Sequence, residues 1–311
     1  MTDKNVDLGV QFGPLKLANP IMTASGTCGY AFELRDFVDM DRLGAYITKS
    51  ITLEPRMGNK PQRTYEVASG MMNAIGLANV GLDKFIEEKI PLLEKMNVPV
   101  IVNVAGKEVP EYVKVAKEVS AQDCVAGLEL NVSCPNVKEG GISFGTDPKL
   151  IQELVGSVRQ ACPDTFLIVK LTPNVTDITV PARAAIDAGA NALSLINTFM
   201  GLAIDAEKRK PILANRTGGV SGPAVKPMAL HMVNRVYNEV AKDAGIPILG
   251  MGGITNATDA IEFILAGATG ISVGTNVLIN PGCLNEIEVG LKEYLIRHHE
   301  TKLSDLIGKL K

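Results

Sequence analysis

The sequence predicts a single (β/α)8 barrel that spans residues 1–311 as one domain. Eight short apolar runs rich in Val, Ile and Leu recur along the 311 residues, and amphipathic segments lie between them. Strands that are buried on both faces of a parallel sheet have this pattern, and their alternation with helices indicates such a sheet. An open doubly wound sheet is the alternative, but eight units without a domain-sized linker favour closure into one barrel.

The expected strands are the eight apolar runs, which in chain order are Pro20–Ala24, Ala45–Thr48, Val100–Val104, Gly127–Leu130, Phe166–Leu171, Ala192–Ile196, Pro247–Met251 and Gly270–Val273. A short hairpin within residues 10–17 is expected ahead of the first strand, where it would close the barrel floor. The expected helices are the amphipathic segments Leu82–Met96, Pro110–Val119, Pro148–Ala161, Val180–Ala188, Pro227–Ala244, Ala257–Ala266 and Leu284–Arg297. Several begin with an N-cap and a first-turn proline, as at Asp147-Pro148.

Three connections are unusually long: residues 49–81, 131–147 and 197–226. All three leave the C-terminal ends of predicted strands, which is where barrel enzymes build their active sites. Because long ordered loops in compact domains are usually functional, we expect the site to lie at this end of the barrel.

The composition excludes several classes of protein. Apolar residues make up 46% and charged residues 21% of the chain, which argues against a disordered protein. The net charge is −3 and no Lys/Arg cluster is present, so nothing favours nucleic-acid binding. No apolar run approaches the ~18 residues of a membrane span, and the polar start does not resemble a signal peptide.

The five cysteines are an odd number, are widely scattered and form no CxxC pair. This argues against a disulfide framework and against a zinc or iron–sulfur site in this chain, so no metal site is expected. We therefore expect a reducing, cytoplasmic location.

Glycines predict a phosphate site at the barrel mouth. Gly250-Met251-Gly252-Gly253 follows the seventh strand, and Gly274-Thr275 follows the eighth. Barrels often hold a phosphate between these two loops, and glycine lets the backbone approach it closely. The run 218–222 could add a third set of backbone donors. Turns and helix starts are the alternative for any one pair of glycines, and a phosphate site alone does not identify its ligand.

A polar cluster is expected at the same rim. Cys134 lies on the loop after the fourth strand, where a thiol can serve as a base or nucleophile. Amides that suit a small planar ligand such as a pyrimidine crowd around it: Asn73, Asn103, Asn131, Asn136 and Asn197.

Two lysines complete the set. Lys170 lies in an apolar strand and Lys49 ends another, and a buried lysine is rarely tolerated without a partner. Each could form a Schiff base or could stabilise developing negative charge.

These features together resemble the dihydroorotate dehydrogenases of the soluble class 1 type, over nearly the whole chain. The motif from Asn131 to Asn136 (NVSCPN) resembles the catalytic-cysteine motif of that family, and residues 48–59 resemble its strand-two signature. Residues 69–77 are similar to its substrate loop, and 218–222 and 250–253 to its FMN loops.

The resemblance implies roles position by position. Cys134 would be the base. The substrate positions are Lys49, Asn73, Ala74, Ile75, Gly76, Leu77, Asn131, Asn136, Asn197 and Thr198. The FMN positions are Ser25, Lys49, Ser50, Asn103, Asn131, Lys170, Ile196, Gly222, Gly252, Gly253, Gly274 and Thr275.

The resemblance also implies the reaction. It is the oxidation of dihydroorotate to orotate in pyrimidine synthesis, with one FMN per chain. The substrate loop resembles the NAD-linked subgroup (class 1B), and Ala78 stands where the fumarate-linked homodimers tend to have proline. This implies a homodimer core with two copies of a partner that carries FAD and a [2Fe–2S] cluster, a heterotetramer. The alternatives are a class 1A-type homodimer that uses fumarate, reduction of a related pyrimidine, a Schiff-base aldolase that uses Lys170, and a barrel that only binds a phosphate ligand.

Overall fold

The computed structural model of the chain describes residues 6–133 and 144–311, and its centre is a closed parallel barrel. Eight strands form one sheet in the order β3-β16-β15-β10-β9-β8-β7-β4. A parallel bridge between Met22 and Ala45 joins the two edge strands and closes the ring. The strands are β3 (Ile21–Thr23), β4 (Tyr46–Ile47), β7 (Val100–Val104), β8 (Val125–Asn131), β9 (Leu167–Lys170), β10 (Ala192–Leu195), β15 (Ile248–Met251) and β16 (Gly270–Val273). The predicted fold and all eight predicted strands are confirmed.

The predicted hairpin is also confirmed, and it covers the floor of the barrel. Strands β1 (Val10–Phe12) and β2 (Leu15–Leu17) pair antiparallel. The fully buried Phe12 ring packs edge-on against Phe166, with 5.8 Å between the ring centroids. Phe166 directly precedes β9, so the hairpin closes the N-terminal end of the barrel and leaves the other end for ligands.

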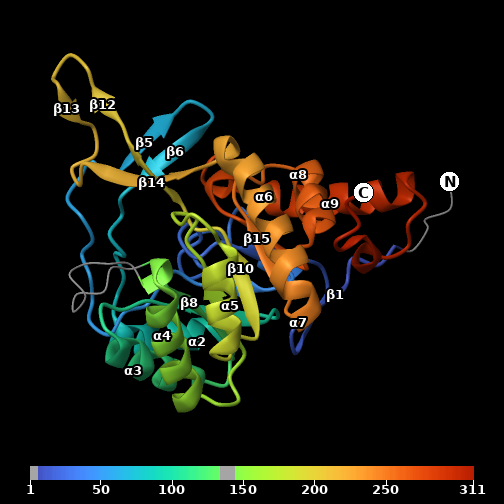
Figure 1. Ribbon diagram of the computed structural model, residues 1–311, viewed down its shortest axis with the longest axis horizontal. Coiled ribbons are helices and arrows are strands. Elements are labelled where there is room, and N and C mark those ends of the chain that lie inside the picture. Colours follow the sequence, from blue (N-terminus) through green and yellow to red (C-terminus); the bar gives the residue numbers. More distant parts are fainter. Residues whose placement is uncertain (1–5, 134–143) are drawn as a thin grey trace.

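Helices surround the barrel, as Figure 1 shows. Their apolar faces pack against the strands because each carries buried residues at helical spacing, such as Ile151, Leu154, Val155 and Val158. The longer helices are α3 (Val109–Ser120), α4 (Pro148–Ala161), α5 (Thr179–Asp187), α6 (Lys226–Val236), α8 (Ala257–Ala266) and α9 (Cys283–Arg297). No helix in the described ranges is both long enough and apolar enough to cross a membrane.

Two predicted helices are not continuous α-helices. The segment expected at 82–96 is α1 (Leu82–Lys84), a π-helical turn (Phe85–Lys89) and α2 (Ile90–Leu93). Pro91 has no N–H to donate to the helix. The backbone N–H of Ile90 donates to the carbonyl of Phe85, five residues earlier, which is the spacing of a π-helical turn. The segment expected at 227–244 likewise contains a π-helical turn, Tyr237–Ala241, between α6 and α7 (Lys242–Ala244).

A second, four-stranded sheet caps the open end of the barrel. Its order is β11-β14-β6-β5, and all its strands come from two of the long connections. They are β5 (Thr64–Val67), β6 (Gly70–Asn73), β11 (Phe199–Leu202) and β14 (Thr217–Ser221). The hairpin of β12 (Ile204–Asp205) and β13 (Lys210–Pro211) extends beyond it, at the upper left of Figure 1.

Candidate active site

A cavity of about 670 Å³ lies between the C-terminal ends of the barrel strands and the cap sheet. Residues from several separate segments line it, because parallel strands bring their C-terminal ends to one edge. The predicted ligand-binding residues that line it are Ser25, Lys49, Ser50, Asn73, Ala74, Ile75, Gly76, Leu77, Asn131, Lys170, Ile196, Asn197, Thr198, Gly222, Gly252, Gly253, Gly274 and Thr275. Cys134 and Asn136 lie outside the described residues.

The charge of the cavity is positive. Among the described residues that line it, Lys49 and Lys170 are the only charged side chains, and there is no carboxylate. Lys170 is 7% exposed, and its Nζ donates to Ser25 Oγ at 3.3 Å. Burial lowers the pKa of Lys49, although nearby Glu33 opposes the shift. A cavity of this charge suits an anionic ligand.

Amides and hydroxyls form a connected group on one wall. Asn197 Nδ2 donates to Asn131 Oδ1 at 3.2 Å and to Ser133 Oγ at 2.8 Å. Asn197 Oδ1 accepts from the Thr198 backbone N–H at 2.8 Å. The Asn131 backbone is held in turn by Tyr112, whose buried hydroxyl donates to its carbonyl at 2.7 Å. The group is therefore held in place by hydrogen bonds within the protein. Ser133 was part of the quoted motif, but sequence reasoning gave it no role.

The loop 73–77 is shaped by the segment 56–59, so two motifs distant in sequence form one unit. Asn59 donates to the Ile75 carbonyl from its backbone N–H and to the Ala74 carbonyl from Nδ2, both at 3.0 Å. Gly58 has φ +75°, and a Cβ there would lie 2.3 Å from the Ile75 carbonyl oxygen. Only glycine permits this approach.

Three loops meet at the predicted phosphate position. A Cβ on Gly253, which has φ +80°, would lie 2.9 Å from the Gly222 carbonyl oxygen, so these loops approach backbone to backbone. Thr275 Oγ1 donates to Ser221 Oγ at 2.8 Å and joins the loop after β16 to the other two. Helix α8 begins a few residues later, with Asn256 as its N-cap. Backbone donors and a helix N-terminus together fit a phosphate group.

The prediction that residues 218–222 donate to phosphate stays a prediction, and the structure shows a packing role for two of these residues, Gly218 and Gly219. Both lie inside β14, which pairs with β11 on one side, and Gly219 also pairs with Asn73 of β6. Close packing explains these glycines: a Cβ on Gly218 would lie 2.6 Å from the Asn73 carbonyl oxygen, and one on Gly219 would lie 2.1 Å from Thr198 Oγ1.

Asn103 is the one described residue of the predicted set that does not line the cavity. It is fully buried in β7, one layer below the rim, and its Nδ2 donates to Glu129 Oε1 at 2.5 Å. Glu129 is a buried carboxyl group that sequence reasoning missed, although a charged residue in the apolar run of β8 was a visible signal.

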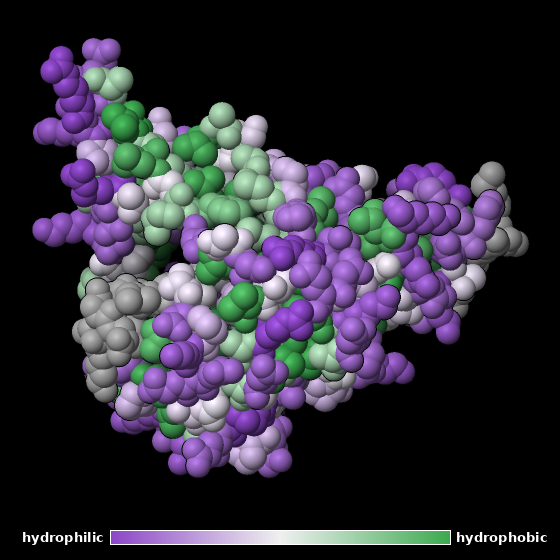
Figure 2. Space-filling view, in the orientation of Figure 1, coloured by the Kyte–Doolittle hydropathy of each residue, from purple (hydrophilic) through white to green (hydrophobic). Residues whose placement is uncertain are grey.

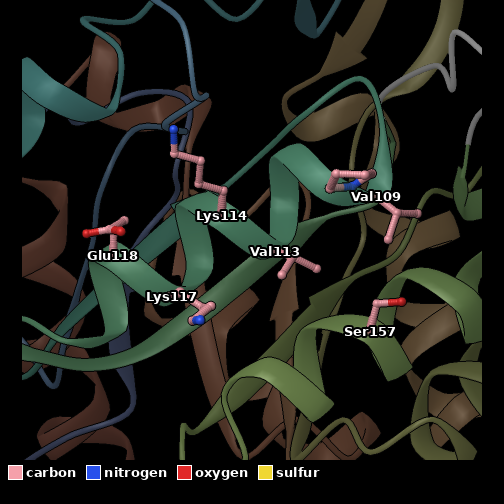
Figure 3. Close-up of a pocket in the computed structure, with 7 residues that line it drawn as sticks. Val109, Val113, Lys114, Lys117, Glu118 and Ser157 are labelled. Carbon is pink, nitrogen blue, oxygen red and sulfur yellow. The ribbon is translucent and has the colours of Figure 1, made fainter.

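A second hollow of about 520 Å³ lies on the outside of the barrel, between α3 and α4 (Figure 3). Its lining includes Lys114, Lys117 and Ser157 but none of the predicted site residues. The cavity at the barrel mouth is therefore the candidate active site.

Comparisons with known proteins identify the family of the chain. The sequence model of the family described as "Dihydroorotate dehydrogenase" matches residues 7–295. The chain is 52% identical over 304 residues to a Pelobacter propionicus protein named "Dihydroorotate dehydrogenase B (NAD(+)), catalytic subunit", covering 98% of both chains. Proteins of the same name from Geobacter metallireducens (51%, 99% of both chains) and Phocaeicola vulgatus (50%, 98% of this chain and 99% of the relative) are similar over their full length. The chain therefore belongs to the dihydroorotate dehydrogenase family.

Proposed function

We propose that this chain is the catalytic subunit of an NAD-linked dihydroorotate dehydrogenase, which oxidises dihydroorotate to orotate in pyrimidine synthesis. One observation carries the proposal: a cavity whose only charged lining residues, among those described, are two lysines, and whose lining includes the phosphate-type loop cluster and several asparagines. The names of its relatives describe the same activity. We further propose that residues 1–311 act as one functional domain.

The proposed cofactor is FMN, one per chain. Its phosphate would be held by the backbone of Gly252, Gly253, Gly274 and Thr275, and the meeting of the three loops there supports this choice. The remaining proposed contacts come from residues along the cavity and just beneath it: Ser25, Lys49, Ser50, Asn103, Asn131, Lys170, Ile196 and Gly222. When bound, FMN supplies the hydride acceptor of the reaction.

The proposed substrate residues, apart from Asn136, also line the cavity. Asn73 through Leu77, Asn131, Asn136, Asn197 and Thr198 would bind the pyrimidine ring through amide and backbone groups, and Lys49 would pair with its carboxylate. Because Asn131 and Asn197 are already hydrogen-bonded to each other, the substrate would meet a partly preformed set of donors and acceptors.

The protein's own chemistry would be a proton transfer. Dihydroorotate loses a proton from C5 and a hydride from C6, and Cys134 as a thiolate would take the C5 proton. The ammonium group of Lys170, held by Ser25, would stabilise negative charge that develops beside it. A Schiff-base role for Lys170 is the competing proposal, and borohydride trapping with a carbonyl substrate would detect it.

We propose that the electrons reach NAD⁺ through a partner subunit that carries FAD and a [2Fe–2S] cluster. The assembly would be a heterotetramer of two such partners on a homodimer core, rather than a homodimer that uses fumarate. The relatives are named as NAD⁺-linked catalytic subunits, which supports this choice. We also propose a cytoplasmic location, in keeping with the scattered cysteines, which form no CxxC pair in the sequence.

The test is a single-turnover experiment on the purified chain. It should be yellow, release one FMN per chain on denaturation, and lose its flavin colour when dihydroorotate is added without oxygen. A colourless chain that takes up no FMN, or bound flavin that dihydroorotate does not reduce, would contradict the proposal.

A further inference from the structure

A buried polar cluster lies directly beneath the candidate active site and is not part of its lining. Glu129 on β8 accepts from Asn103 Nδ2 of β7 at 2.5 Å through Oε1, and from Ser194 Oγ of β10 at 2.9 Å through Oε2. All three residues are 0% exposed. Asn131 follows Glu129 by two positions on the same strand and lines the cavity, so the cluster forms the layer below it.

A carboxyl group in the core of a barrel is costly unless it is fully hydrogen-bonded. Glu129 meets this requirement with one donor on each oxygen. The hydrogen bond to Glu129 also sets the orientation of the Asn103 side-chain amide. In the structure the NH₂ end of the Asn103 amide faces Glu129, and its Oδ1 faces away from that carboxyl group.

The Asn103 Oδ1 atom is the feature that remains unexplained. It is buried and has no hydrogen-bond partner among the described residues. The backbone of Asn103 is fixed, since its N–H donates to Thr48 Oγ1 at 3.3 Å and its carbonyl accepts from the Ile51 N–H at 2.8 Å. A buried acceptor left unpaired costs about 1–3 kcal/mol, a cost that a donor on a bound ligand would remove.

We propose that Glu129 is a positioning residue for the cofactor: it holds the Asn103 amide so that Oδ1 is presented as a hydrogen-bond acceptor to an N–H or O–H group of bound FMN. This inference rests on the proposed function, because FMN is the ligand proposed for the cavity above. Glu129 itself touches no ligand, and its whole effect on FMN passes through Asn103. Ser194 completes the carboxyl group's hydrogen bonds.

The test is a double-mutant cycle on FMN affinity, measured by titrating flavin-free protein and following flavin fluorescence. Glu129→Leu and Asn103→Leu should each weaken FMN binding by about tenfold, as expected for one buried hydrogen bond. The double variant should bind FMN no more weakly than Asn103→Leu alone, because Glu129 acts only through Asn103. Effects that multiply would overturn the proposal, as would an unchanged affinity in Glu129→Leu.

Two further variants separate positioning from simple support of the fold. Glu129→Gln can still accept from Asn103 and can donate to Ser194, so it should retain most of the FMN affinity; a loss as large as that of Glu129→Leu would contradict the proposal. Glu129→Gln also keeps the proposal testable if Glu129→Leu does not fold. Glu288→Leu is the matched control, since Glu288 is a buried carboxyl group on α9 that binds Arg42 and Lys292 away from the cavity. It should lower stability and leave FMN affinity unchanged. If the unaltered protein takes up no FMN, the proposed function fails rather than the role of Glu129.

Discussion

Two asparagines of the site differ in the hydrogen bonds that their side chains make within the protein. The Asn73 amide has no hydrogen-bond partner among the described residues, whereas the Asn197 amide holds both Asn131 and Ser133. Asn73→Ala should therefore weaken orotate binding by about tenfold through loss of its own contact, with FMN retained and stability unchanged. Asn197→Ala should weaken orotate binding more and should also lower stability. Orotate titrations and thermal unfolding check both; unchanged orotate affinity in both variants would remove these residues from the substrate site.

Cys134 is proposed as the base, and its chemistry predicts a pH signature. Cys134→Ala should keep FMN and orotate bound but should lose flavin reduction by dihydroorotate. Cys134→Ser should keep some activity that rises with pH, because a hydroxyl gives up its proton less readily than a thiol, whose reference pKa is about 8.5. Stopped-flow flavin reduction across a pH series measures this. An alanine variant that reduces its flavin at the normal rate would exclude Cys134 as the base.

Thr275 offers a cleaner test of the phosphate site than its glycines do. Any side chain on Gly253 would strain a positive φ and would meet the backbone of Gly222 and Lys226, so loss of flavin there would also report a displaced loop. Thr275→Val keeps the shape of the side chain but removes the hydroxyl that donates to Ser221. It should lower FMN affinity by about fivefold to tenfold without loss of fold. Equal FMN affinity in the threonine and valine forms would argue against a phosphate at this loop.

At the scale of elements, the cap sheet depends on glycines that let its strands pack closely. Gly219→Ala would place a Cβ 2.1 Å from Thr198 Oγ1 and should push β14 and β11 apart. Overpacking of this kind costs about 1–3 kcal/mol, so we expect reduced stability in urea and weaker orotate binding. Gly156→Ala is the control: it lies in α4, where an added Cβ would meet nothing within 4 Å, and alanine favours the helix. Equal effects of the two substitutions would disprove the packing role of Gly219.

A difference between the barrel strands and the cap strands explains which elements the sequence could predict. The barrel strands are continuous apolar runs such as Val100–Val104, buried at every position, and their pattern is local. The cap strands have no such pattern: β5 is mostly exposed, and β14 is rich in glycine. Their pairing joins residues about 150 positions apart, as between Met71 and Ser221, and it depends on close approaches that a linear sequence does not display.

The same difference between local sequence patterns and long-range contacts applies to the residues of the site. Residues at strand ends, such as Lys170 and Asn131, could be placed at the mouth because the topology determines where strands end. The Glu129 cluster could not, because it requires three strands to bring Asn103, Glu129 and Ser194 into contact. The motifs also contain glycines with two separate roles, since Gly253 allows loops to meet beside the cavity and Gly219 allows strands to pack closely.

At the scale of the whole molecule, the surface beside the site carries several exposed apolar side chains. Met200, Leu202 and Ile204, on β11 and β12, are 54–65% exposed, and Leu278 and Ile279 beside the cavity mouth are 54% and 75% exposed. Figure 2 shows hydrophobic side chains gathered on the surface near the β12–β13 hairpin. Exposed apolar surface of this kind is typical of protein–protein interfaces, which supports the proposal that the chain works within an assembly.

The final electron acceptor is expected to depend on that assembly rather than on the chain alone. The sequence has no GxGxxG motif after a strand and no cysteine cluster, so it lacks the usual means of holding NAD⁺, FAD or an iron–sulfur cluster. With dihydroorotate, the isolated chain should reduce its own flavin but should form no NADH. Co-expression with the iron–sulfur flavoprotein partner should restore NADH formation, and the complex should have the mass of a heterotetramer by light scattering. Assays of both preparations with NAD⁺ and with fumarate distinguish the two subgroups. If the isolated chain turns over rapidly with fumarate, and the co-expressed preparation forms no NADH, the chain belongs with the fumarate-linked homodimers. The flavin, the base and the barrel would be unaffected by that result, since each is tested by an experiment on the isolated chain.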